Sequence, residues 1–103
     1  MIMTTTDAII GKNLQMLGLV KGNVVRAKHI GRDIMAGFKT LVGGEISGYT
    51  ELLIEAREIA TSRMMDEAKS MGADAVVCVR YVTCSVMDGA SEVMAYGTAV
   101  KFV

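Results

Sequence analysis

The segment Asp74–Met87 constrains the fold of this chain more than any other stretch. It is dense in β-branched and aromatic residues, which are typical of strands. The pair Asp88-Gly89 follows, and a type I′ hairpin turn needs residues that tolerate positive φ at both of its central positions. Glu92–Val103 then returns as a second β-forming stretch. The sequence therefore predicts a C-terminal β-hairpin.

The first half of this strand is apolar on both faces. Side chains alternate between the faces of a strand, so Val76 and Cys78 point to one side, and Ala75, Val77 and Val79 to the other. A sheet covered by helices on one side only is expected to have one polar face. Since no further helices are predicted that could form another layer, we expect a neighbouring subunit to cover the second face.

Two helices are predicted in the middle of the chain. The first follows from apolar residues that recur with helical spacing at Ile34, Met35, Phe38, Leu41 and Val42. The pair Gly43-Gly44 then provides a natural helix stop. Ser47 can cap a longer helix that runs to about Met71, before Gly72. Its apolar side carries Tyr49, Leu52, Leu53, Ala56, Ala60, Met64 and Met71, opposite Glu55, Glu58, Ser62 and Lys69.

The N-terminal part is predicted to be β-structure. Ile2–Thr6 favours a short strand, and Leu14–Val20 and Val24–His29 are two further β-prone runs. Lys21-Gly22-Asn23 between them is compatible with a hairpin turn or with a bulge in one long strand. Together the elements predict a single α+β domain over residues 1–103. It is a two-layer sandwich with two helices packed on a mainly antiparallel sheet.

Composition excludes several classes of protein. Of the 103 residues 51% are hydrophobic, which excludes disorder. Eleven basic residues balance eleven acidic ones, so no net field attracts nucleic acid or an anionic membrane. The longest apolar run is far shorter than the ~20 residues of a membrane-spanning helix. The start resembles no signal peptide, and two cysteines form no disulfide framework. We therefore expect a cytoplasmic protein with neither nucleic acid nor membrane as a partner.

The order and spacing of many short segments resemble the YbjQ-like family, which carries a heavy-metal-binding label. The matching residues are Thr4–Thr6, Gly22–Ala27, Arg32–Ile34, Val42–Gly44, Ser47–Tyr49, Ala56-Arg57, Met64, Glu67-Ala68, Gly72–Val77 and Tyr96–Val100. The resemblance implies a dodecin-like β-α-β-β subunit with extra N-terminal strands that assembles into a closed homo-oligomer, a pentamer. Extra short strands are then expected to bridge the subunits. It implies little about activity.

Two cysteines are the candidate metal ligands, since soft ions prefer thiolates. Cys78 and Cys84 lie six residues apart on one predicted strand, which separates them by about 20 Å. Ligands of one ion lie within roughly 4 Å of each other, given metal–sulfur bonds near 2.3 Å. One chain therefore cannot chelate an ion with both thiols unless the strand breaks, although a ring could bring copies of one cysteine together. The commoner role of a buried cysteine is that of a small apolar residue. Cys78 also stands where the family is expected to have glycine or another small residue, so the resemblance does not make it a ligand.

A basic cluster is the candidate anion site. It comprises Arg26, Lys28, His29 and Arg32, where a strand gives way to a predicted helix N-terminus. Free amides and the helix dipole favour anions at such a position, so a ligand with a phosphate or carboxylate could dock there. The alternative is that these bases pair with the acidic long helix, within or between subunits.

No catalytic residues can be assigned. His29 is the only histidine and has no identifiable nucleophile beside it, and Gly43-Gly44 lacks the lysine of a phosphate-binding loop. Arg63 and Glu67 are spaced to meet on one helix, as framework or interface groups. The leading hypothesis is a non-enzymatic ring that binds a small ligand or ion in its pore or at subunit interfaces, with no cofactor assigned. The alternatives are a structural or adaptor ring that recruits another protein, and a hydrolase or transferase with sites between subunits.

Overall fold

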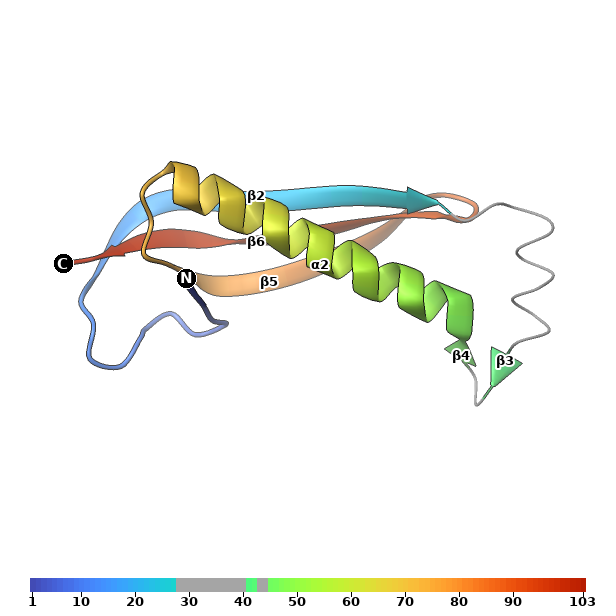
Figure 1. Cartoon of the computed structure of the whole chain (residues 1–103), viewed down its shortest axis with the longest axis horizontal. Helices are drawn as coiled ribbons and strands as arrows, with labels where there is room; N and C mark the ends of the chain where they lie inside the picture. The colour runs from blue at the N-terminus through green and yellow to red at the C-terminus, as the bar shows by residue number, and fades with distance from the viewer. Residues whose placement is uncertain (28–40, 43–44) are drawn as a thin grey trace.

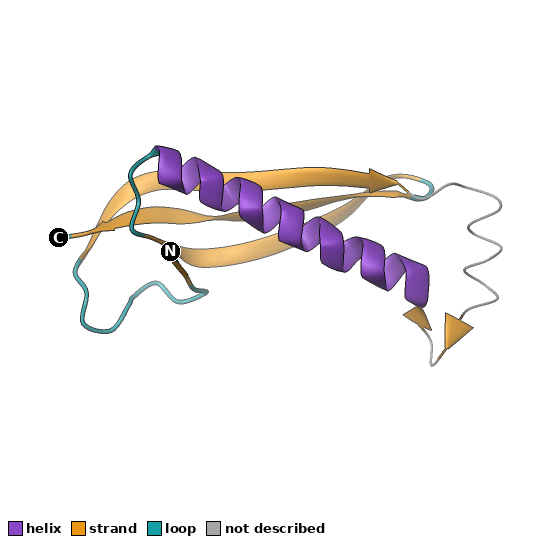
Figure 2. Ribbon diagram, in the orientation of Figure 1, coloured by secondary structure: helices purple, strands orange, loops and turns teal. Residues whose placement is uncertain are grey.

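The computed structural model describes residues 1–27, 41–42 and 45–103. One long helix lies across a four-stranded sheet, as Figures 1 and 2 show. The strand order is β1-β5-β6-β2, with β1 parallel to β5 and the other neighbours antiparallel. The strands of the sheet are β1 (Ile2–Met3), β2 (Leu14–Ala27), β5 (Ala75–Met87) and β6 (Ala90–Phe102). The helix that covers them is α2 (Ser47–Ser70). No helix among the described residues is long and apolar enough to cross a membrane.

The C-terminal hairpin is confirmed. β5 and β6 pair antiparallel from Ala75–Val100 to Met87–Ala90, and the turn lies at Asp88-Gly89. Gly89 has a φ of 77°, whereas Cys78 is the one non-glycine residue with positive φ in the described part of the chain. Asp88 therefore has negative φ, and the predicted type I′ turn is wrong in its detail because only one of the two central residues is left-handed.

The second β-prone run and the third as far as Ala27 form one continuous strand, and Lys28 and His29 lie outside the described residues. Lys21 and Asn23 lie opposite Tyr96 and Met94 in an unbroken ladder, so they form neither a turn nor a bulge. The irregularity of β2 lies instead between Met16 and Gly18. Of the two alternatives from the sequence, the single long strand is correct, with its bulge at another place.

The long helix is confirmed, with a fully buried stripe at Ala56, Ala60, Met64 and Ala68. It ends before Gly72, whose φ of 77° stops the helix. The three alanines have short side chains, so the helix approaches β2 and β6 closely and covers β5 much less. In Figure 1 the helix runs diagonally over the sheet.

The first predicted helix is wrong at its C-terminal end. Leu41–Val42 forms the short strand β3, which pairs antiparallel with β4 (Glu45–Ile46). The helix stop predicted at Gly43-Gly44 lies outside the described residues. The rest of the proposed helix lies outside the described residues.

The second face of β5 is covered by the chain itself. Ala75 and Val77 form a small cluster with Val100, against which Ile9 and Leu14 pack. The N-terminal segment is held there by the Thr4 amide, which donates to the Val76 carbonyl at 3.0 Å, and by further backbone bonds. For this part of the sheet, the expectation that only a neighbouring subunit could cover the second face is therefore wrong.

Candidate functional site

Of the predicted anion site, only Arg26 lies within the described residues. Its Nη2 donates to Oε1 of Glu55 on α2 at 2.8 Å, in a partly exposed ion pair. This is the alternative expected from the sequence, in which the bases pair with the acidic long helix. Lys28, His29 and Arg32 fall in the range 28–40, so their positions relative to Arg26 are not described.

The two candidate metal ligands differ in their surroundings. Cys78 is half-buried and packs against the cluster of Ala75, Val77 and Val100, whereas Cys84 is exposed. Within residues 1–27, 41–42 and 45–103, no three His, Cys, Asp or Glu side chains are close enough together to hold a metal ion. A single chain therefore offers no chelating set in its described part.

Cys78 also breaks the regular alternation of β5. Its φ of 56° is left-handed, and the register with β6 shifts between Val77 and Arg80. The extra residue moves Val79 to the helix-side core, beside Val76. Strict alternation had predicted that Val79 shares a face with Ala75, and this is wrong because of the bulge.

The helix and β5 enclose an open groove, which the sequence analysis did not predict. Its volume is about 580 Å³ and its lining is mostly apolar. The lining residues are Met3, Ile54, Arg57, Glu58, Thr61, Ser62 and Tyr81. Five of these lie on α2 at helical spacing, forming a second stripe beside the buried alanines. Ile54, an apolar residue outside the predicted apolar side, was the signal in the sequence that could have indicated it.

A chain of hydrogen bonds fixes one wall of the groove. The Thr61 hydroxyl lies 2.7 Å from the Arg57 carbonyl oxygen and 2.8 Å from the Tyr81 hydroxyl. A carbonyl only accepts, so Thr61 donates to Arg57 and the Tyr81 hydroxyl donates to Thr61. Because the Tyr81 hydroxyl uses its proton in this bond, its oxygen in the groove lining can act only as a hydrogen-bond acceptor.

The described partner of Arg63 is a backbone carbonyl of the sheet and not Glu67, the partner expected from the sequence. Its Nη1 donates to the Asn23 backbone carbonyl of β2 at 2.7 Å. The arginine therefore joins the helix to the middle of the sheet. No bond between Arg63 and Glu67 is among the interactions described.

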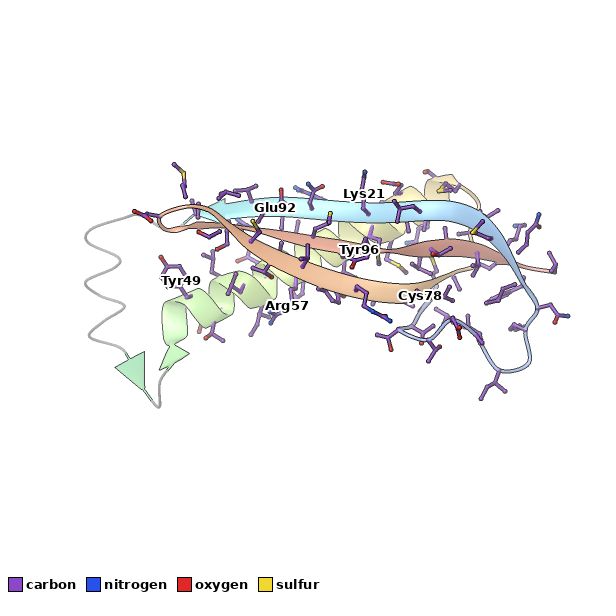
Figure 3. All side chains as sticks on the ribbon, turned by 180° about the vertical axis from the view of Figure 1, so that it is seen from behind. Lys21, Tyr49, Arg57, Cys78, Glu92 and Tyr96 are labelled. Carbon is purple, nitrogen blue, oxygen red and sulfur yellow. The ribbon has the colours of Figure 1, made fainter. Side chains whose placement is uncertain are left out.

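The sheet face opposite α2 carries mixed side chains, seen from its own side in Figure 3. Tyr96 of β6 lies between Lys21 of β2 and Arg80 of β5 in the ladder. Arg80 donates to the Thr5 and Val79 carbonyls, at 3.0 and 2.9 Å. Towards the hairpin turn this face becomes apolar and exposed at Val25 and Val82.

Several known proteins are similar to this chain over nearly its whole length. The family model YbjQ_1, described as "Putative heavy-metal-binding", matches residues 1–103. A UPF0145 protein of Vibrio parahaemolyticus is 59% identical, covering 100% of this chain and 99% of the relative. One from Thermotoga maritima is 60% identical, covering 98% and 96%. One from Clostridium novyi is 54% identical with full coverage of both.

A solved structure supports the fold. A protein of unknown function of the DUF74 family from Pediococcus pentosaceus superposes with a TM-score of 0.67. The match covers 100% of this chain and 98% of that chain, at 18% sequence identity. At this identity, the likeness supports the α+β fold and carries no information on activity.

Proposed function

This chain belongs to the YbjQ family, and on that basis we propose that it is a subunit of a closed homo-oligomeric ring that binds a small ligand or ion. The ligand would lie at subunit interfaces or in the pore. The ring would have five subunits, as the family resemblance implies, with a dodecin-like β-α-β-β core. The short strands β3 and β4 are candidates for bridging between subunits.

The observation that carries this proposal is the exposed apolar surface of the long strands. Every residue of β5 from Arg80 to Met87 is exposed, and Met87 and Leu19 are 65% and 63% exposed. Extended apolar patches on soluble proteins generally mark interaction sites. A subunit interface would bury this surface, whereas an isolated chain would leave it in water.

The groove beside α2 is the proposed ligand site. Met3 and Ile54 contribute apolar side chains to the lining of the groove. Arg57 contributes a positive charge, and the described residues show no ion-pair partner for it. The Tyr81 oxygen can accept one hydrogen bond. These groups suit a small molecule with an apolar body and an anionic group, held by apolar contact and by a charge-assisted bond.

A metal ion would need more than one copy of the chain. Cys78 and Cys84 are the only thiols, and the described residues of one chain form no ligand cluster. Thiolate coordination releases protons, so binding through these groups would weaken as pH falls. The number of ions bound per chain would be fractional.

The ligand part is tested with anilinonaphthalene sulfonate, a fluorescent probe with an apolar body and one anionic group. We expect Arg57→Ala to weaken binding about tenfold, and Lys69→Ala, a charge removal on the same helix outside the groove, to leave it unchanged. Equal affinity of the wild type and Arg57→Ala would contradict the groove as the site. A ring that binds neither this probe nor zinc or copper(I) would favour the adaptor alternative.

A further inference from the structure

The groove between α2 and β5 holds two opposite charges on neighbouring residues. Arg57 and Glu58 both line it, and both are exposed. Successive residues of a helix are turned by about 100° around its axis, so their side chains diverge and do not face each other. Among the ion pairs of the described residues, none joins Arg57 to Glu58. The groove therefore presents a separate cation and a separate anion.

Neither charge has an opposite charge within reach on its own helix. Side chains of a helix meet when they lie three or four positions apart. The positions at this spacing from Arg57 hold no acid, since they are Leu53, Ile54, Ala60 and Thr61. The positions at this spacing from Glu58 hold no base, since they are Ile54, Glu55, Thr61 and Ser62. Both groups are therefore available to a bound molecule.

The ion pairs that the structure describes lie outside the groove. Glu55, three positions before Glu58, is held by Arg26 of β2 at 2.8 Å. A second pair joins Asp74 to Lys101 at 4.0 Å, beyond the C-terminal end of α2. The sheet thus supplies a base to the helix beside the groove, but no described residue supplies one to Glu58 or an acid to Arg57.

The polar groups of the groove match the two ends of a zwitterion. A guanidinium only donates hydrogen bonds, so Arg57 suits a carboxylate. An ammonium has three N–H donors and no acceptor, so it suits a carboxylate together with a further acceptor. Glu58 supplies the carboxylate. The Tyr81 oxygen supplies the acceptor, because its own proton is used in the bond to Thr61.

We propose that the groove binds an apolar α-amino acid in its zwitterionic form. The carboxylate of the ligand pairs with Arg57, its ammonium pairs with Glu58 and the Tyr81 oxygen, and its side chain packs on Met3 and Ile54. Neighbouring Cα atoms lie only 3.8 Å apart, so the two protein charges favour a ligand whose own charges share one carbon atom. This inference rests on the proposed function and names the ligand class of the same site.

The dimensions of the groove favour a large side chain on the ligand. A helix rises about 1.5 Å per residue, so the lining from Ile54 to Ser62 extends over about 12 Å. The volume is about 580 Å³, and most of the lining is apolar. The two charges lie near the middle of this length. The remaining space on either side suits an aromatic or long aliphatic side chain better than the hydrogen of glycine.

Isothermal titration calorimetry with L-phenylalanine and its derivatives tests the two charge contacts. N-acetyl-L-phenylalanine lacks the ammonium, and phenethylamine lacks the carboxylate. We expect L-phenylalanine to bind about tenfold more tightly than either derivative, because each derivative loses one charged hydrogen-bonded contact. Glycine keeps both charges but has no side chain to bury, so it should also bind about tenfold more weakly.

Variants of the two charged residues assign each contact. Glu58→Gln should weaken the binding of L-phenylalanine about tenfold and should not weaken that of N-acetyl-L-phenylalanine. Arg57→Ala should weaken the binding of both. Glu51→Gln removes an exposed carboxylate of α2 outside the groove and should change neither affinity. Circular dichroism establishes that each variant is folded.

Two results would overturn this inference. One is L-phenylalanine that binds no more tightly than its N-acetyl derivative, and the other is a Glu58→Gln variant with undiminished affinity for L-phenylalanine. Anilinonaphthalene sulfonate carries no ammonium, so its binding through Arg57 can persist in both cases. The proposed function would then stand without the amino acid as ligand. Loss of the Arg57 effect on both probes would instead overturn the groove as the site.

Discussion

Gly22 of β2 lies directly against Ala60 of α2. A Cβ atom on Gly22 would overlap the Ala60 carbonyl oxygen and the Met64 amide nitrogen, and would stand 2.8 Å from the Arg63 Cβ. The backbones of strand and helix therefore touch at this point with no side chain between them. This contact sets the distance between the two layers.

Replacing Gly22 tests that contact. Gly22→Ala should lower the free energy of unfolding by about 3 kcal/mol, the upper part of the usual range for overpacking, because the helix must move away from the sheet. Asn23→Ala, an exposed neighbour on the same strand, should change it by less than about 0.5 kcal/mol. Urea unfolding of the two variants makes the comparison. Equal effects would show that the layers have room to separate.

The same glycine shows why sequence reasoning was incomplete. Glycine suits a turn through its conformational freedom, and it suits a close contact because it has no side chain. The sequence cannot say which property is in use. Both segments flanking Lys21-Gly22-Asn23 were correctly predicted to be β-structure, because their composition is sufficient evidence. Their union into one strand depends on the partner β6 and on the helix, which lie far away in the sequence.

The long helix and the C-terminal hairpin were predictable for a different reason. Their periodicity, turn residues and stops are all local, and all indicate the same structure. The groove was not predictable, since Tyr81 and Thr61 meet only through the packing of α2 on the sheet. The bulge was hidden as well. Nothing in the types of its neighbours indicates that Cys78 adopts a left-handed φ.

The strain at Cys78 leads to a second prediction. A left-handed φ costs a residue with a side chain roughly 1–2 kcal/mol, a cost that glycine avoids. Cys78→Gly should therefore leave stability unchanged or raise it. Cys78→Val should lower the free energy of unfolding by at least about 1 kcal/mol, since β-branched residues are outliers at positive φ. Chemical unfolding under reducing conditions measures both.

Cys84 is the matched position for this comparison. It lies in the regular part of the same strand, where glycine weakens and valine favours the β conformation. Cys84→Gly should lower stability by about 0.5–1 kcal/mol, and Cys84→Val should not. If glycine is less stabilising than valine at position 78, as is expected at position 84, the bulge at Cys78 is absent in solution.

Among the residues whose burial the structure describes, Met64 is the largest fully buried side chain, and it lies in the core between α2 and the sheet. Truncation leaves a cavity that the small neighbours cannot fill, so Met64→Ala should cost about 3 kcal/mol of stability. Met16→Ala removes the same side chain where it is 75% exposed, and should cost less than about 0.5 kcal/mol. Thermal unfolding of both variants measures the difference between their losses of stability.

The ion pair between Arg26 and Glu55 should contribute little to stability. Its side chains are 34% and 59% exposed, and such pairs typically couple by about 0.5 kcal/mol. A double-mutant cycle with Arg26→Ala and Glu55→Ala should give this coupling at low salt and less at 1 M salt. A salt-independent coupling of several kcal/mol would mean that the pair is buried in the assembly.

Native mass spectrometry of the reduced protein measures how many chains the assembly contains. The exposed apolar edge and faces of the long strands predict an assembly of 11.0 kDa chains with no monomer at micromolar concentration. We expect five chains, the number of the proposed single ring. A folded monomer of 11.0 kDa as the main species would contradict the proposal that this surface is a subunit interface.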